Sequence, residues 1–225
     1  MKIKTNHLIT RVAVAAAVIF SVSSCSKDDD NDSMMNAKLS FVNTVEGSAA
    51  QDIFINDSKV STSAVAYGSS SNEISTTAGN KTISFKNANS ATVTASAEVN
   101  TNVNSSHTAF LVKQANGTMG ISLYANDNTA ASGKAKVRFI NVAPMLTSTI
   151  NVTTSTGTNL ISALAFKAAS AYQTIDANTN LNVMMTGSLE VTTITGSELQ
   201  AGKIYTIWFD SSTTTKAKYH IVVHN

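Results

Sequence analysis

The residues able to carry metal or catalytic chemistry are few and far apart in this 225-residue chain. Beyond the N-terminal segment the histidines are His107, His220 and His224. None of them has a cysteine or an acidic residue at the spacing of a metal-binding motif. Histidines scattered in this way are usually structural or exposed, so we predict no metal site.

Short motifs that resemble known sites each lack an essential residue. Asp28, Asp30 and Asp32 match the start of a calcium loop, but the turn glycine and the final glutamate are missing. The segment Gly196–Lys203 has too many residues between its glycines for a phosphate-binding loop, and Ile204 replaces the magnesium-binding Ser or Thr. No Gly-x-Ser-x-Gly sequence marks a nucleophilic serine. We therefore expect no catalytic residues, no cofactor and a non-enzymatic protein; a hydrolase would require a concave pocket in which acidic or Ser and His side chains converge.

Cys25 is the residue whose surroundings point most clearly to chemistry. As the only cysteine it cannot form a disulfide within the chain. Basic residues precede the apolar segment Val12–Phe20, which is about half the length of roughly 20 residues needed to span a bilayer. Small residues then lead directly to Cys25. This order is typical of a bacterial lipoprotein signal, so we predict a signal peptide over 1–24 and lipidation of Cys25.

The segment 25–36 reads as an acidic tether without a strand or helix period. Its first charged residues resemble the surface-export signal of Bacteroidetes lipoproteins. These residues are Lys27, Asp28, Asp29 and Asp30. We expect a lipid-anchored protein of the outer membrane, exposed on the cell surface, with a periplasm-facing anchor as the alternative. Asp32-Ser33-Met34 also resembles the O-glycosylation acceptor of that phylum, which makes Ser33 a candidate site.

The charge balance gives no indication of a nucleic-acid partner. The chain has 16 basic and 14 acidic residues, and three of the basic ones lie in the predicted signal peptide. The remaining chain is close to neutral, whereas nucleic-acid binding needs a clustered basic face. The expected partners are the membrane, through the lipid anchor, and surface proteins or glycans.

The chain repeats itself at offsets of 97 to 99 residues. Ala37–Asn43 recurs as Ala135–Asn141, Val65–Tyr67 as Leu164–Phe166, Thr82–Phe85 as Leu181–Met184, and Thr108–Val112 as Tyr205–Phe209. A period of this length indicates a duplicated domain rather than a solenoid. We place the modules at 37–127 and 134–225, with a linker of small and polar residues at 128–133.

Apolar residues alternate with polar ones through most of each copy, as around Ile83 and Phe85 or Ile150 and Val152. This period of two is typical of half-buried strands. Short strands separated by Asn, Gly and Ser turns over some 90 residues indicate a β-sandwich. We predict an all-β protein with two tandem immunoglobulin-like antiparallel sandwiches of seven or eight strands. The continuously apolar segments near the end of each copy should be central strands. Residues 160–171 could also form a helix, but their match to the first copy favours a strand.

Several segments in order resemble one known family. They are Ala135–Pro144, Asp52–Asn56, Val65–Gly68, Thr77–Lys81 and Ala201–Thr206. Together they are similar to successive strands and turns of the family called domain of unknown function 4397, in two copies over residues 37–225. Copy one lacks the Ala-Pro that follows the opening strand, and copy two has Lys167 where the family has glycine. The resemblance implies an exported β-sandwich and no catalytic residues.

Two functions remain in competition. The first is a non-enzymatic surface lipoprotein whose modules act as a structural, adhesive or protein-binding unit. The alternative is a carbohydrate-binding accessory lipoprotein of a glycan-uptake system. Tyr205 and Trp208 could form a sugar-stacking platform, although their apolar neighbours favour packing in the core. Burial of both side chains would count against the glycan alternative.

Overall fold

The computed structural model of the protein describes residues 36–224. Within that range it contains sixteen β-strands and one short 3-10 helix, η3 (Gly196–Glu198), and no α-helix. The prediction of an all-β protein is therefore confirmed. No helix in this range is long and apolar enough to cross a membrane.

The first eight strands form one sandwich of two four-stranded sheets. One sheet has the order β4-β1-β7-β8 and the other β3-β2-β5-β6. The strands are β1 (Asn36–Asn43), β2 (Gln51–Ile55), β3 (Ser58–Lys59), β4 (Ile74–Thr77), β5 (Gly79–Asn87), β6 (Val93–Thr101), β7 (Ser106–Lys113) and β8 (Met119–Ala125). We call this sandwich unit one.

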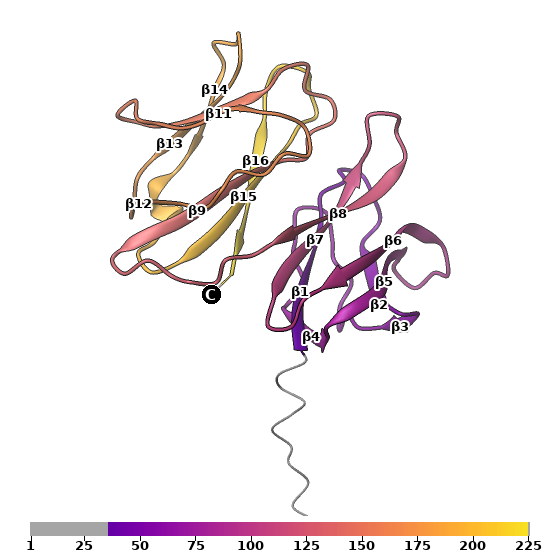
Figure 1. Ribbon diagram of the computed structural model, residues 1–225. Coiled ribbons are helices and arrows are strands. Elements are labelled where there is room, and N and C mark those ends of the chain that lie inside the picture. Colours follow the sequence, from indigo (N-terminus) through magenta and orange to yellow (C-terminus); the bar gives the residue numbers. More distant parts are fainter. Residues whose placement is uncertain (1–35, 225) are drawn as a thin grey trace, which may run out of the picture.

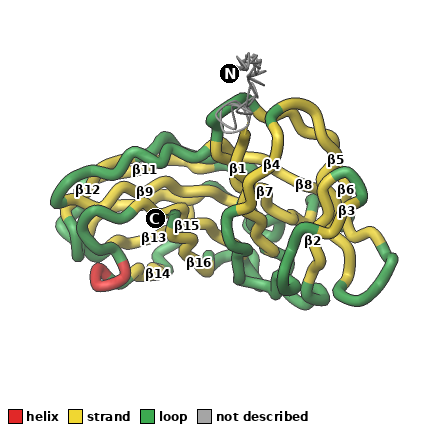
Figure 2. The backbone as a smooth tube through the Cα atoms, turned by 90° about the horizontal axis from the view of Figure 1, so that it is seen from below, coloured by secondary structure: helices red, strands yellow, loops and turns green. Residues whose placement is uncertain are grey.

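The last eight strands form a second sandwich, unit two, with the same strand order. Its sheets are β12-β9-β15-β16 and β11-β10-β13-β14, so each strand takes the position of the strand eight places earlier. The strands are β9 (Lys134–Asn141), β10 (Ile150–Thr154), β11 (Asn159–Leu164), β12 (Gln173–Asp176), β13 (Leu181–Met185), β14 (Val191–Ile194), β15 (Ile204–Asp210) and β16 (Lys218–Val223). The two units lie side by side in both backbone views (Figures 1 and 2).

The pairing between strands is antiparallel except at one place in each unit. β1 runs parallel to β7, and β9 runs parallel to β15. Residues 160–164 of the ambiguous segment belong to β11, as the match between the copies favours, whereas residues 165–171 form no helix and only an isolated bridge at Ala169.

The registers correct two of the matches made on sequence. Lys38 lies opposite Ser106 and Lys136 lies opposite Ile204, so β7 and β15 correspond at an offset of 98 rather than 97. Likewise the core residue Ile83 corresponds to Leu181, not to Asn182. A slip of one residue exchanges the two faces of a strand, so the sequence matches placed inward residues opposite outward ones.

Each unit has its own apolar core between its two sheets. Unit one buries Leu39, Phe41, Ile53, Phe85 and Leu111 among others. The core of unit two includes Val137, Phe139, Val183, Ile207 and Phe209. These residues come from alternate positions of facing strands, which is the pattern that places one face of each strand in the core.

A third apolar cluster joins the two units, and we call it the joint core. Its buried members are Val42, Phe110, Val112, Ile140, Val142, Trp208 and Val222. Val142 directly follows β9, and the others lie on the faces of β1, β7, β9, β15 and β16 opposite to those that fill the unit cores. The continuously apolar strands β7 and β15 are central in their sheets, as predicted, and each serves a unit core with one face and the joint core with the other.

Candidate functional site

The predicted lipidation, export and glycosylation residues lie outside the described part of the chain. They are Cys25, Lys27, Asp28, Asp29, Asp30 and Ser33. No geometry is available for them, so these assignments stay predictions.

The three histidines of the described residues 36–224 occupy different places. His107 lies on β7 near the end of unit one, His220 on β16 beside the joint core, and His224 directly after β16. Within residues 36–224 no group of three or more His, Cys, Asp or Glu side chains could hold a metal ion.

A polar cluster borders the joint core and links both units. The Tyr67 hydroxyl donates a hydrogen bond to Asp210, whose other carboxylate oxygen lies 3.2 Å from His220 Nε2. Lys218 Nζ lies 2.8 Å from Glu46 Oε1 and 3.3 Å from the Tyr67 hydroxyl. Burial, followed by the hydrogen bond to the Asp210 carboxylate, raises the pKa of Tyr67 to about 12. The Tyr67 hydroxyl therefore stays protonated, and its hydrogen bond to Asp210 connects unit one to unit two.

Trp208 and Tyr205 are packing residues rather than a binding platform. Trp208 is fully buried in the joint core and stacks on the His220 ring at 3.9 Å between centroids. Tyr205 is 3% exposed in the core of unit two, and its hydroxyl accepts a hydrogen bond from the Gln200 N–H at 2.8 Å. Neither ring is available to a sugar. The core role favoured on sequence is confirmed for both side chains.

Arg138 supplies a second polar link across the joint. Its side chain is buried, and it donates to Thr206 Oγ1 at 2.9 Å, to Asn126 Oδ1 at 2.7 Å and to the Ala125 carbonyl. The guanidinium also lies 4.9 Å from the Tyr172 ring. Burial lowers the pKa of Arg138, although the group stays charged because an arginine pKa is so high. Arg138 thus ties the end of β8 to β9 and β15.

The best exposed candidate for binding is a polar surface on the outer side of β5 and β6, which we call the polar face. Asn80 lies opposite Asn100, Thr82 opposite Glu98, and Ser84 opposite Ser96. Their side chains alternate with the inward Lys81, Ile83 and Phe85, because successive residues of a strand point to opposite faces. The result is a row of amide, hydroxyl and carboxylate groups on one sheet surface.

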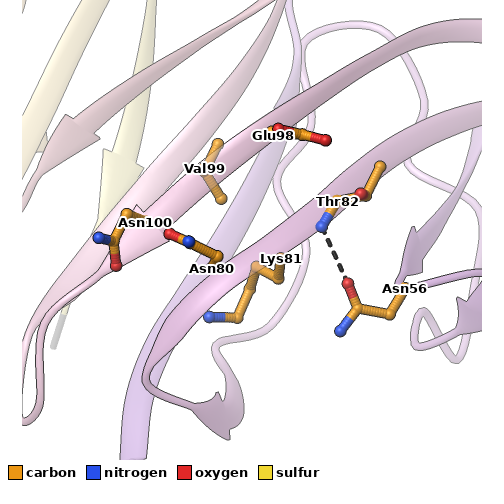
Figure 3. A pocket seen from close by; sticks show the side chains of 7 residues that line it. All are labelled: Asn56, Asn80, Lys81, Thr82, Glu98, Val99 and Asn100. Carbon is orange, nitrogen blue, oxygen red and sulfur yellow. Dashed lines mark hydrogen bonds between the residues drawn. The ribbon is translucent and has the colours of Figure 1, made fainter.

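A cavity of about 490 Å³ opens at one end of the polar face. Figure 3 shows its lining side chains. They are Asn56, Asn80, Lys81, Thr82, Glu98, Val99 and Asn100. The Asn56 Oδ1 accepts a hydrogen bond from the Thr82 N–H at 2.9 Å, which fixes the turn after β2 against β5.

Two charged side chains line this cavity, the buried Lys81 and the exposed Glu98. Lys81 Nζ is directed to neutral acceptors, the Gly79 carbonyl and Thr101 Oγ1, both at 2.8 Å. Burial lowers the pKa of the Lys81 ammonium. The carboxylate of Glu98 is exposed on the outer surface. Amides and hydroxyls dominate the lining, so the cavity can form hydrogen bonds in both directions but offers no paired acid and base.

This surface was not identified as a site from the sequence, although the alternation of polar and apolar residues in β5 indicates an outward polar side. The alternation of Thr82 and Ser84 with Ile83 and Phe85 shows which residues face outward. What the sequence does not show is that β5 lies beside β6, which places Asn100, Glu98 and Ser96 in the same row.

Comparison with known families gives a clear result. The sequence model of the family described as domain of unknown function (DUF4397) matches residues 37–153. The match covers more than half of the chain. The chain belongs to the DUF4397 family. The DUF4397 match spans unit one from Ala37 onward, all of β9 and β10 up to Thr153.

Other comparisons add little to the DUF4397 assignment. No significant match was found among curated proteins. Among solved structures, the chain is similar to the crystal structure of CBMbc (family CBM26) from Eubacterium rectale Amy13K in complex with maltoheptaose. The sequence identity is 10% and the TM-score 0.28, with coverage of 85% of this chain and 98% of that chain.

Proposed function

We propose that this DUF4397 protein is a non-enzymatic lipoprotein of the outer membrane whose two sandwiches act together as a structural, adhesive or protein-binding unit on the cell surface. The observation that supports a single unit made of both sandwiches is the joint core, whereas the lipid anchor and the location rest on the N-terminal sequence. Seven buried apolar residues from both units close it, and polar links border it. Such a joint resembles an obligate interface more than a flexible linker, so both units hold one orientation. Proposed module boundaries are 37–127 and 134–225.

The polar face is the proposed contact surface for a protein partner at the cell surface. Asn80, Ser96, Glu98 and Asn100 of this face are exposed, and the face lies on a sheet and presents amide, hydroxyl and carboxylate groups. A photo-crosslinking residue at position 82 on intact cells should give a defined adduct. The same residue at position 193, on the outer side of β14 in unit two, is the matched control. Equal labelling from both positions, or none from position 82, contradicts the assignment of this face.

The lipid anchor is proposed at Cys25. Labelled palmitate should be incorporated into the protein in cells, and Cys25→Ala should abolish incorporation. A multi-chain anchor would hold the protein at the membrane by burial of its acyl chains. Unchanged labelling of Cys25→Ala would contradict the anchor.

Cell-surface exposure is proposed from the acidic residues after Cys25. Protease added to whole cells should degrade the protein together with known surface proteins. Substitution of Asp28, Asp29 and Asp30 by alanine should protect the protein, because a lost export signal leaves it facing the periplasm. If the native protein resists protease on intact cells, the periplasm-facing alternative is correct. Modification of Ser33 would appear as a mass increase that Ser33→Ala removes.

Glycan binding as an accessory lipoprotein of a glycan-uptake system is the second candidate. The lining of the polar face favours it, because amides, hydroxyls and a carboxylate suit sugar hydroxyl groups. Phe54, half-buried on the same sheet under Lys86 Nζ at 4.0 Å, adds an aromatic ring. Burial of Tyr205 and Trp208 counts against a platform in unit two. Affinity electrophoresis through soluble polysaccharides tests this candidate: retardation that Thr82→Ala and Glu98→Ala abolish supports glycan binding, and unretarded migration argues against it.

A further inference from the structure

Strand β6 is the longest edge strand of the molecule's described part. It has nine residues, whereas β3 has two and β4, β12 and β14 have four each. On one side β6 pairs with β5 from Val93 to Thr101, with a bulge at Thr94. On the other side no strand of the described chain pairs with it. A long edge presents a row of backbone groups to which another strand can add.

The edge of β6 also lacks the features that usually prevent strand addition. Its only charged residue is Glu98, and it contains neither lysine nor proline. Among the other long edges, β16 carries Lys218, and β11 has irregular register and a left-handed residue, Ala163. The edge strand β8 is also uncharged, but it is two residues shorter than β6. In β6 the one irregularity lies at the end, next to Val93. Residues from Ala95 to Thr101 pair regularly with β5.

The backbone groups that face outward can be assigned from the register. Ser96 Oγ lies 3.3 Å from the Ile83 carbonyl oxygen, so that carbonyl faces β6, and Ile83 lies opposite Ala97. Adjacent residues of an antiparallel strand direct their N–H and C=O groups to opposite sides. Ser96, Glu98 and Asn100 therefore direct both groups away from β5.

Apolar side chains are half-exposed on the inner side of this edge. They are Ala97 and Val99 of β6 and Ile121 and Leu123 of β8. In unit two the equivalent strand β14 is tied across to the other sheet by Thr192 Oγ1, which donates to the Ala217 carbonyl at 2.8 Å. In unit one no such hydrogen bond within residues 36–224 joins the two sheets at this edge, whereas in unit two the Thr192 bond does.

We propose that the β6 edge binds β6 of a second copy of this chain, in an antiparallel pair centred on Ala97. Ala97 is the middle of the strand, so this register pairs Val93 with Thr101 and uses the whole length. It places Ser96 opposite Glu98 and Thr94 opposite Asn100, which are pairs of hydrogen-bonding partners. A centre at Glu98 would instead oppose two carboxylates, which is unfavourable. The pair turns two four-stranded sheets into one continuous sheet with two-fold symmetry. This inference does not depend on the proposed function.

Cysteine crosslinking of the full chain tests the register. Ala97 faces its own copy across the two-fold axis at a Cα separation of about 4.5 Å, which suits a disulfide. Ala97→Cys should form an intermolecular disulfide under mild oxidation. Val99→Cys is the matched control on the same face, because its two copies are four residues apart along the strands, or roughly 13 Å. The unsubstituted chain controls for Cys25. Crosslinking of Val99→Cys as efficient as that of Ala97→Cys overturns the register.

The second test blocks the edge without disturbing the sandwich. Glu98→Pro removes an outward N–H, and proline is tolerated at an edge whose N–H faces solvent. Sedimentation of the full chain should show a dimer whose Kd rises at least about tenfold in Glu98→Pro, or about 1.4 kcal/mol. Glu98→Thr keeps the N–H and should still dimerise. An unchanged circular dichroism spectrum shows that the proline variant is folded. If the native chain sediments as a monomer at all concentrations, or Glu98→Pro dimerises as tightly, the proposal is wrong.

Discussion

At the scale of residues, two buried asparagines, Asn43 and Asn141, make equivalent hydrogen bonds in the two units. Asn43 Oδ1 accepts a hydrogen bond from the Val45 N–H at 3.1 Å, and Asn141 Oδ1 accepts one from the Ala143 N–H at 3.0 Å. Their amide nitrogens reach the carbonyls of Val65 and Leu164. Each asparagine therefore fixes the chain after the first strand of its unit to a later segment.

Gly68 and Lys167 occupy equivalent turns with different residues. Both have positive φ, +78° at Gly68 and 63° at Lys167. The Gly68 N–H donates to the Asn43 carbonyl, as the Lys167 N–H does to the Asn141 carbonyl. A Cβ at Gly68 would also lie 3.3 Å from the His220 ring. The lysine that departs from the family pattern thus keeps the same backbone conformation at a steric cost.

The first prediction exploits this pair of turns. Gly68→Ala should destabilise the protein by about 1–2 kcal/mol, because alanine disfavours positive φ and crowds His220. Lys167→Gly should leave stability unchanged or raise it by up to about 1 kcal/mol, since only the steric cost is removed. Urea denaturation followed by circular dichroism measures both. Equal destabilisation by the two substitutions would refute the assignment of strain to Lys167.

The second prediction concerns His224 and pH. Burial first, and then the positive charge of Arg138, lower the pKa of His224 to about 4. Its Nε2 lies 2.6 Å from Thr206 Oγ1. Unfolded His224 takes up a proton near pH 6.5, so between pH 6.5 and 4 the unfolded state binds more protons than the folded state. Stability should therefore fall as pH falls through this window, by about 2 kcal/mol from His224 alone.

His224→Gln should flatten the pH dependence of the free energy of unfolding between pH 7 and pH 4.5. Some slope should remain, because burial also lowers the pKa of His107. The carboxyl groups of Asp52 and Asp127, whose pKa values are lowered by lysine partners, lose their contribution only at more acidic pH. A pH profile of His224→Gln identical to that of the native protein would contradict the prediction.

At the scale of elements, much of the fold could be predicted from alternating hydrophobicity and from the internal repeat. Both patterns are local or compare equal segments, so the strands and the equivalence of the units follow from them. The joint core could not be predicted. In β7 the residues Phe110 and Leu111 are equally apolar, and only the assembled structure shows that one faces unit two and the other the core of unit one.

The polar face and the polar cluster around Tyr67 could not be predicted either. Tyr67 and Asp210 are far apart in sequence, and nothing local indicates that their side chains meet. Glu98 is one of several isolated acidic residues in the sequence. Its neighbours on the adjacent strand β5, such as Thr82, are defined only by the strand register. The apolar neighbours of Trp208 did predict its burial correctly, but not that its partners come from both units.

The third prediction tests the attachment of β9 by Asn141. Asn141→Ala should cost about 1–3 kcal/mol, because the buried Ala143 N–H and Leu164 carbonyl lose their side-chain partner. Asn151→Ala, at a half-exposed position of β10, is the control and should have a smaller effect. Hydrogen exchange should show that the Ala143 amide loses protection in Asn141→Ala. Retained protection would mean that the hydrogen bond does not hold this segment.

At the scale of the whole molecule, the joint makes two sandwiches behave as one. Apolar contacts, the Tyr67 cluster and Arg138 all cross it, and they use the outer faces of the sheets that contain β1 and β9. The sheets containing β5 and β13 remain on the outside, so the polar face of unit one is held at a constant orientation to unit two.

The fourth prediction is that the units unfold together. Native protein should show a single urea transition, whereas Trp208→Ala should lose about 3–5 kcal/mol and separate the transitions of the two units. Trp208→Phe is the control, since Phe110 occupies the equivalent position in unit one. It should be milder and keep a single transition. A single cooperative transition in Trp208→Ala would show that the joint does not couple the units.

The chain contains one tryptophan, and it lies in this joint against the His220 ring. Its fluorescence should therefore be blue-shifted by burial and weakened by the stacked imidazole. Any partner, ligand or membrane attachment that opens the joint will change the emission of the unlabelled protein. Trp208 fluorescence can therefore report directly on any movement of unit one relative to unit two at the joint core.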